Sequence, residues 1–264
     1  MEAIECLTNG SAGLFIYADT LIKFVDKGQP EEQLESILSG PLHCRSITQL
    51  YRQILDMSFL NPSGMVPEGF RKVMGTIILM KIPLGHQDVL HLLDMKPVAF
   101  DHICNGIRSV LGTGDPLCFI HQSFVDFLMD SNGCHPSFLF STAIQSCTLL
   151  LSSLRVMKSE LKFNICKMET SHVIHDEIPY LKEHVDQNIS MHLQYACRFW
   201  MDHIHKCDFD EQIASEVEDF MGNKFLYWLE VMSSVQEVNW VTQGLHSVVI
   251  WSKVRVIKMP TRDN

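Results

Sequence analysis

Apolar residues near the start of the chain recur at the spacing of an α-helix. Between residues 47 and 59 they stand at i, i+3, i+4, i+7, i+8 and i+12, which is one helix face; they are Ile47, Leu50, Tyr51, Ile54, Leu55 and Phe59. The preceding run Ser46-Ile-Thr-Gln49 has the form of a capping box, and Asn61-Pro62 is a helix stop. The pattern predicts an amphipathic helix over residues 47–59, which must bury its apolar face against other elements.

The same periodicity continues along most of the chain. It predicts further helices near residues 14–25, 30–40, 70–83, 84–93, 100–111, 144–157, 185–204 and 217–232. Gly112 to Pro116 has turn chemistry, and the apolar run Leu117 to Ile120 is the best β-strand candidate. Three short helices, a turn and a strand are the pattern of a winged helix. The last dozen residues are expected to be a frayed end.

These patterns predict a mainly α fold with three consecutive parts. Residues 1–62 are expected to form a helical segment, residues 63–130 a winged-helix domain with a small β-wing, and residues 131–264 a helical arm. The chain has 264 residues, 46% of them hydrophobic and 20% charged. This composition is typical of a globular protein with a core and is too apolar for a disordered chain.

The charge of the chain disfavours nucleic acid as a partner. The formal net charge is −10, whereas binding to phosphate backbones or to anionic membranes requires a basic surface. The predicted recognition helix lies near residues 97–111. Between residues 94 and 130 there are five acidic residues against two basic ones, Lys96 and Arg108. DNA binding by the winged helix is therefore the weaker alternative.

Neither a membrane span nor a secreted disulfide framework is predicted. The most apolar stretch, residues 73–84, is interrupted by Lys81 and Pro83 and is shorter than the ~20 residues that a span needs. The nine cysteines are odd in number and lack the spacing of a zinc knuckle. The first fifteen residues do not resemble a signal peptide. These features indicate reduced cysteines in a cytoplasmic protein.

Catalytic signatures are absent from the sequence. It contains no phosphate-binding G-x-x-x-x-G-K-[ST] loop, no G-x-S-x-G nucleophile elbow and no H-E-x-x-H zinc motif. His121 stands two positions before Ser123, but closeness in sequence is not the geometry of a catalytic triad. The sequence therefore predicts no catalytic residues and no self-contained enzyme.

The sharpest metal candidate is the run His203-Ile-His205-Lys-Cys207. On a helix His203 and Cys207 share a face, whereas His205 points nearly the opposite way. Zinc needs three or four converging ligands, so a solvated helix end is the favoured interpretation and no metal site is predicted. The pair His172 and His175 lacks a third ligand nearby in the sequence.

Four stretches, in this order, resemble the region that follows the NTPase core in fungal NACHT proteins, which are STAND-class signalling ATPases. They are Ser11 to Thr20; Leu50 to Leu55 with Val73 to Leu79 and Pro83-Leu84; Phe119 to Leu128, close to the family's hHxSFxDFL run; and Leu161 to Cys166 with Leu193 to Trp200 and Asp202-His203. The resemblance covers about residues 10–235. It implies a NLR-like, non-catalytic regulatory segment that acts in signal transduction through domain–domain packing.

The resemblance also implies a nucleotide-sensing role for one residue. In such proteins a histidine of the winged helix donates a hydrogen bond to the phosphate of bound ADP, and the matching residue here is His121. The stretch Gly13 to Ile16 matches the helix that packs under the nucleotide. The NTPase core itself is expected to lie outside this chain. ADP or ATP would then be held by a core acting in cis or in trans, with no cofactor in the isolated chain.

The resemblance leads to two further expectations, one about an exposed helix face and one about the residues beside His121. Leu14, Phe15 and Ile22 would face the NTPase core, so we expect them to be exposed in this chain and to favour self-association. Near His121, Ser123 is expected to cap a helix, with Phe124 and Phe127 in the core. The alternative is a stand-alone helical protein-interaction module without nucleotide control.

Overall fold

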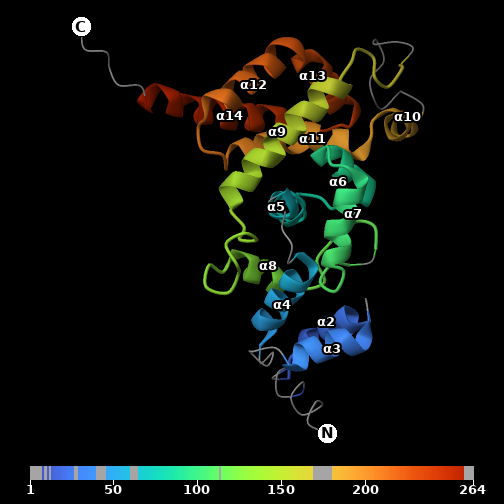
Figure 1. Cartoon of the computed structure of the whole chain (residues 1–264). Helices are drawn as coiled ribbons and strands as arrows, with labels where there is room; N and C mark the ends of the chain where they lie inside the picture. The colour runs from blue at the N-terminus through green and yellow to red at the C-terminus, as the bar shows by residue number, and fades with distance from the viewer. Residues whose placement is uncertain are drawn as a thin grey trace. The chain divides into compact units, whose positions relative to one another are not determined.

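The computed structural model describes residues 8, 11, 13–26, 29–39, 46–59, 65–112, 114–168 and 180–258. These residues are mainly helical and contain no β-sheet (Figure 1). The helices are α2 (Phe15–Val25), α3 (Pro30–Ser39), α4 (Ile47–Phe59), α5 (Met65–Leu79), α6 (His86–Leu93), α7 (Pro97–Gly106), α8 (Gln122–Met129), α9 (Thr142–Glu160), α10 (Leu181–Asn188), α11 (Met191–Ile204), α12 (Glu211–Asn223), α13 (Phe225–Ser234) and α14 (Asn239–Lys258). None of them is long and apolar enough to cross a membrane.

The chain forms two compact units, and each of them is discontinuous in sequence. Unit 1 comprises Met1–Ile78 and Met95–Ser141, and unit 2 comprises Leu79–Asp94 and Thr142–Asn264. Helix α6 therefore belongs to unit 2, although it lies between α5 and α7 in the sequence. This division differs from the three consecutive parts expected above, which stay a prediction.

The core of unit 1 is built around α4, which begins and ends where the periodicity predicts. The predicted apolar face is buried from Leu50 to Phe59. The backbone N–H of Gln49 donates to the Ser46 hydroxyl at 3.3 Å, so the expected serine cap is present. The Phe59 ring packs edge-on against Phe70, and an added Cβ at Gly106 would lie 2.8 Å from Cε1 of Phe59. Gly106 therefore allows α7 to approach α4 closely.

The β-structure of unit 1 is smaller than the predicted strand. Leu111 and Phe119 form one isolated antiparallel bridge. It is flanked by hydrogen bonds from Gly112 N–H to Cys118 C=O at 2.8 Å and from Ile120 N–H to Val110 C=O at 3.0 Å. No ladder extends it among the described residues, because the helical turns of α7 end just before it and α8 begins just after it.

Unit 2 has a core of helices packed around α11. This helix packs against α9, α14, α6 and α13, and in Figure 1 the orange α11 runs beside the yellow-green α9. Trp200 and Trp228 are fully buried in this core, and their rings meet edge-on with centroids 6.0 Å apart. The indole N–H of Trp228 donates to the Cys197 carbonyl at 2.9 Å.

Three helix boundaries in unit 2 differ from the expected ones. The predicted helix over 185–204 is two helices, because the Ser190 hydroxyl accepts from Leu193 N–H and caps a new start. The predicted helix over 217–232 is likewise interrupted at Lys224. The prediction of a frayed end was wrong as far as residue 258, because α14 occupies 239–258. Its apolar residues are spread around the helix, so no single stripe marked it.

Candidate functional site

His121 is placed at the amino end of α8, where it caps the helix with its own side chain. Its backbone is extended, and its ring Nδ1 accepts a hydrogen bond from Ser123 N–H at 3.1 Å. Ser, Thr, Asp and Asn usually take this role. The expectation that Ser123 caps the helix is therefore wrong: the cap is His121. Because Nδ1 acts as an acceptor, the proton of the neutral ring lies on Nε2.

A chain of hydroxyl groups supports the His121 ring from inside unit 1. The Ser123 hydroxyl lies 2.8 Å from Nδ1 of His121 and 2.7 Å from the Tyr51 hydroxyl. Tyr51 also bonds the Thr20 side chain of α2. Since Nδ1 can only accept, the Ser123 hydroxyl donates to it and the Tyr51 phenol donates to Ser123. Burial raises the pKa of Tyr51, which keeps its proton on the phenol.

The aromatic residues beside His121 fix this arrangement in the core. Phe124 and Phe127 are buried, as expected, and both rings contact Tyr51, with centroids 5.1 and 5.6 Å away. The Tyr51 ring is thus held on two sides while its hydroxyl reaches Ser123. His121 itself is exposed, and no described residue bonds its Nε2. The geometry therefore presents one N–H donor to solvent from a rigid support.

This geometry does not form a nucleophile–base pair of the hydrolase type. The Ser123 hydroxyl is within reach of a histidine, but Nδ1 already accepts the Ser123 backbone N–H as well. Within the described part of the chain no carboxylate contacts the other nitrogen, so the ring lacks the third group that orients a catalytic base. The arrangement is suited to hydrogen-bond donation rather than to proton abstraction.

The residues of the metal candidate are used in the core of unit 2. His203 is 1% exposed, and its Nε2 lies 2.8 Å from the Tyr195 hydroxyl. The Cys207 thiol donates a hydrogen bond to the His203 carbonyl at 3.3 Å. The indole N–H of Trp251, in α14, donates to the Cys207 carbonyl at 3.0 Å. The interpretation as a solvated helix end is wrong for His203 and Cys207, because both side chains are buried; of the three candidate ligands only His205 is exposed.

Electrostatics agree with this assignment of His203 to the core. Burial, together with the nearby charges of Lys81 and Lys206, lowers the pKa of His203 to about 3. Burial also raises the pKa of the Cys207 thiol. No three His, Cys, Asp or Glu side chains converge on a metal position within the described ranges. His172 and His175 lie outside the described residues.

A second polar cluster, in unit 2, was not anticipated from the sequence. Asp88 of α6 accepts from the backbone N–H of His192 at 3.1 Å and from its ring Nδ1 at 3.0 Å. Glu160 of α9 lies 3.1 Å from the other ring nitrogen, Nε2, and the Ser190 hydroxyl lies 3.0 Å from it. The His91 ring stacks on His192 at 5.2 Å. The cluster ties α6, α9 and α11 together.

The charges show why this cluster is structural despite its triad-like geometry. Burial opposes a charge on His192, but hydrogen bonds to Glu160 and Asp88 outweigh it and raise the His192 pKa. The hydrogen bond from His192 lowers the pKa of Glu160. With both ring nitrogens donating to carboxylates, the imidazolium form is favoured, and it cannot take a proton from Ser190. The four residues are 2 to 104 positions apart, so no local pattern revealed them.

No protein-family model, curated protein or solved structure matches the chain. The function is therefore inferred from the geometry around His121 and from the sequence stretches described above.

Proposed function

We propose that this chain is a non-catalytic regulatory segment of a NACHT-type STAND signalling protein, and that His121 senses ADP held by the NTPase core. The observation that carries this proposal is the orientation of the imidazole. Its Nδ1 is held by Ser123, and its Nε2–H is left for an acceptor outside the described residues. A phosphate oxygen is such an acceptor, and a neutral ring donates to it without needing to be charged.

The position of His121 at a helix start also suits an anion. The amino end of α8 carries partial positive charge, so a phosphate that meets Nε2–H is favoured by the helix as well. His121 lies within the region that the sequence predicts to be a winged helix. We propose that α7, the Leu111–Phe119 bridge and α8 are its final part, with the wing reduced to one bridge.

Helix α2 offers the surface on which the NTPase core would pack. Its inner face, including Tyr17, Leu21 and Phe24, is buried. Phe15 and Ile22 lie on the opposite face and are 84% and 67% exposed, as the sequence predicts. Because α2 has apolar side chains on its exposed face as well as on its buried face, the exposed face can be buried against a partner. Release of ADP would remove the His121 contact and shift the balance between closed and open arrangements.

The test is nucleotide-dependent capture of a P-loop NTPase. The immobilised chain is incubated with extract of the cells that produce it, with ADP or with a non-hydrolysable ATP analogue, and retained proteins are identified by mass spectrometry. We expect a P-loop NTPase to be retained with ADP and released with the ATP analogue. His121→Ala should reduce retention about tenfold, which corresponds to one charge-assisted hydrogen bond of about 1.4 kcal/mol.

His135→Ala is the matched control, because His135 is also exposed in unit 1 and accepts Ser137 N–H at 3.2 Å through Nδ1. It should retain the NTPase as the unaltered chain does. If retention of the NTPase changes neither with the nucleotide nor with His121→Ala, nucleotide sensing is contradicted. That result would favour the second candidate, a helical protein-interaction module without nucleotide control, whose docking surface is the exposed face of α2.

A further inference from the structure

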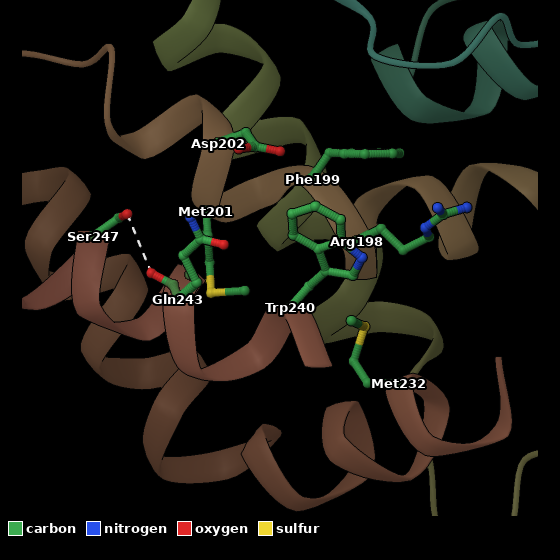
Figure 2. A pocket seen from close by; sticks show the side chains of 9 residues that line it. Arg198, Phe199, Met201, Asp202, Met232, Trp240, Gln243 and Ser247 are labelled. Carbon is green, nitrogen blue, oxygen red and sulfur yellow. Dashed lines mark hydrogen bonds between the residues drawn. The ribbon is translucent and has the colours of Figure 1, made fainter. Parts of the chain in front are cut away.

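Unit 2 contains a cavity of about 220 Å³ between α11, α13 and α14. Figure 2 shows the side chains of Phe199, Met201 and Met232 arranged around the indole ring of Trp240. Arg198 and Asp202 also line the cavity. The cavity therefore combines an aromatic and thioether wall with two charged groups at its border, all from helices of one unit.

The cavity is formed by a close approach of two helices. Gly244 of α14 lies against Met201 of α11, and an added Cβ there would lie 3.2 Å from Cβ of Met201 and also meet its thioether. Any larger residue would push Met201 into the cavity or α14 away from α11. The glycine thus keeps Met201 along the wall and leaves the space beside it open.

The wall is suited to a planar aromatic ring. Met232 is fully buried and Met201 nearly so, whereas Trp240 is 60% exposed and offers a ring face at the mouth. Methionine sulfur and indole both make favourable contacts with aromatic rings. An apolar cavity of about 150 Å³ can hold benzene, so about 220 Å³ accommodates a ring with a short side chain.

The charges around the cavity select for a cation. Arg198 is neutralised by Glu237, with an N–O distance of 2.7 Å, and its guanidinium lies 5.1 Å from the Phe199 ring centroid. Asp202 makes no hydrogen bond or ion pair with any residue that the structure describes. The lining therefore includes one carboxylate that no described residue pairs directly, although Lys81 and Lys206 lie near the adjacent His203; this carboxylate attracts an ammonium group and repels a carboxylate.

We propose that this cavity binds a small aromatic amine, with its ring against Trp240, Met201 and Met232 and its ammonium group facing Asp202. This site lies in unit 2 and is independent of the role proposed for His121.

Binding of three indole probes, one cationic, one neutral and one anionic, tests this site. Tryptamine, indole and indole-3-acetate are each titrated into the full chain and followed by calorimetry or ligand-observed NMR. We expect tryptamine to bind at least about tenfold more tightly than indole-3-acetate, a difference of about 1.4 kcal/mol. Asp202→Asn should bring the ratio close to one and leave the binding of neutral indole unchanged.

Two further variants separate the cavity from the surface. Trp240→Ala should weaken all three probes at least about tenfold while leaving the helical circular dichroism unchanged, because the Trp240 side chain is largely exposed. Asp208→Asn, which removes an exposed acid of unit 2 outside the cavity lining, should change nothing. The proposal is overturned if tryptamine does not bind at millimolar concentration, or if its advantage over indole-3-acetate survives Asp202→Asn.

Discussion

The carboxylate of Asp88 accepts two hydrogen bonds from His192, one from the backbone N–H at 3.1 Å and one from the ring at 3.0 Å. The two residues are 104 positions apart in the sequence. Helix α6 is thereby attached to the start of α11 through a single charged side chain. The strength of the hydrogen bond from the ring depends on the protonation state of His192, which makes it accessible to experiment.

The stability of unit 2 should fall as the pH rises above neutrality. The His192 pKa is raised above its ordinary value of 6.5, so the stability contributed by this cluster is fully present below 6.5 and is lost as the pH rises through the raised pKa. His192→Gln should cost about 2 kcal/mol at about pH 5.5, and clearly less at about pH 8.5. Urea unfolding followed by tryptophan fluorescence measures both values. His246→Gln, an exposed histidine of α14, is the control, and an equal loss at both pH values would refute the charged tie.

His203 predicts the opposite pH dependence on the acid side. Its pKa is lowered from 6.5 to about 3, so the stability gained by burying the neutral ring is present above 6.5 and lost as the pH falls towards 3. The loss should approach about 1.4 kcal/mol per pH unit. His203→Gln should therefore flatten the acid limb of the unfolding curve, whereas His205→Gln, at an exposed position, should leave it unchanged. A steep acid limb in His203→Gln would argue against this assignment.

Gly106→Ala should destabilise unit 1 by about 1–3 kcal/mol through overpacking. The added methyl group would meet the Phe59 ring, and that ring cannot swing away because Phe70 and Phe138 pack on it with centroids 5.4 and 5.9 Å away. Gly222→Ala, also near a helix end, meets nothing within 4 Å and should instead stabilise by up to about 1 kcal/mol. Thermal unfolding of the two variants should thus shift in opposite directions; shifts of the same sign would contradict the close packing.

The neutral His121 ring should carry its proton on Nε2. Nitrogen-15 NMR distinguishes the tautomers, and the chain supplies an internal reference. Nδ1 of His91 lies 2.7 Å from the Gln87 carbonyl and must therefore be protonated in a neutral ring, which is the opposite tautomer. Tyr51→Phe should leave the His121 tautomer unchanged, because Ser123 N–H still donates to Nδ1. A ring protonated at Nδ1 would remove the geometric basis for phosphate sensing.

The exposed face of α2 should cause the chain to self-associate. Phe15→Lys should lower the concentration-dependent increase in sedimentation coefficient, since it places a charge where Leu14, Phe15 and Ile22 gather. Val98→Lys is the control, because Val98 is 82% exposed on α7, apart from that group. A monodisperse unaltered chain at about 100 μM would contradict the expectation.

Local patterns predicted most helices and failed where partners are distant. The start and the buried face of helix α4 were predicted, because an apolar stripe and a serine cap lie within the same local segment. The strand was overestimated at Leu117 to Ile120, because a strand needs a pairing partner and, among the described residues, Leu111 is the one that forms a bridge with it. Helix α14 was missed, because its apolar side chains do not form one stripe.

The same limit applies to the residues of the candidate site. His121 stays a prediction that comes from the family resemblance, and its support by Tyr51, 72 residues before Ser123, could not be foreseen. His203 was taken for a surface residue, because nothing in its own segment shows that Trp251 covers the following turn. The cluster around His192 depends on residues from three helices, so it required the fold itself.

The interleaving of the two units has a consequence for how the chain is made and cut. Helix α6 leaves the ribosome before any of the other described helices of unit 2. More than a hundred further residues must be synthesised before His192, the partner of Asp88, is available. A protease that cleaves once near residue 141 would leave a carboxy-terminal fragment containing His192 and Glu160 without Asp88. No single cut between the units releases either of them whole.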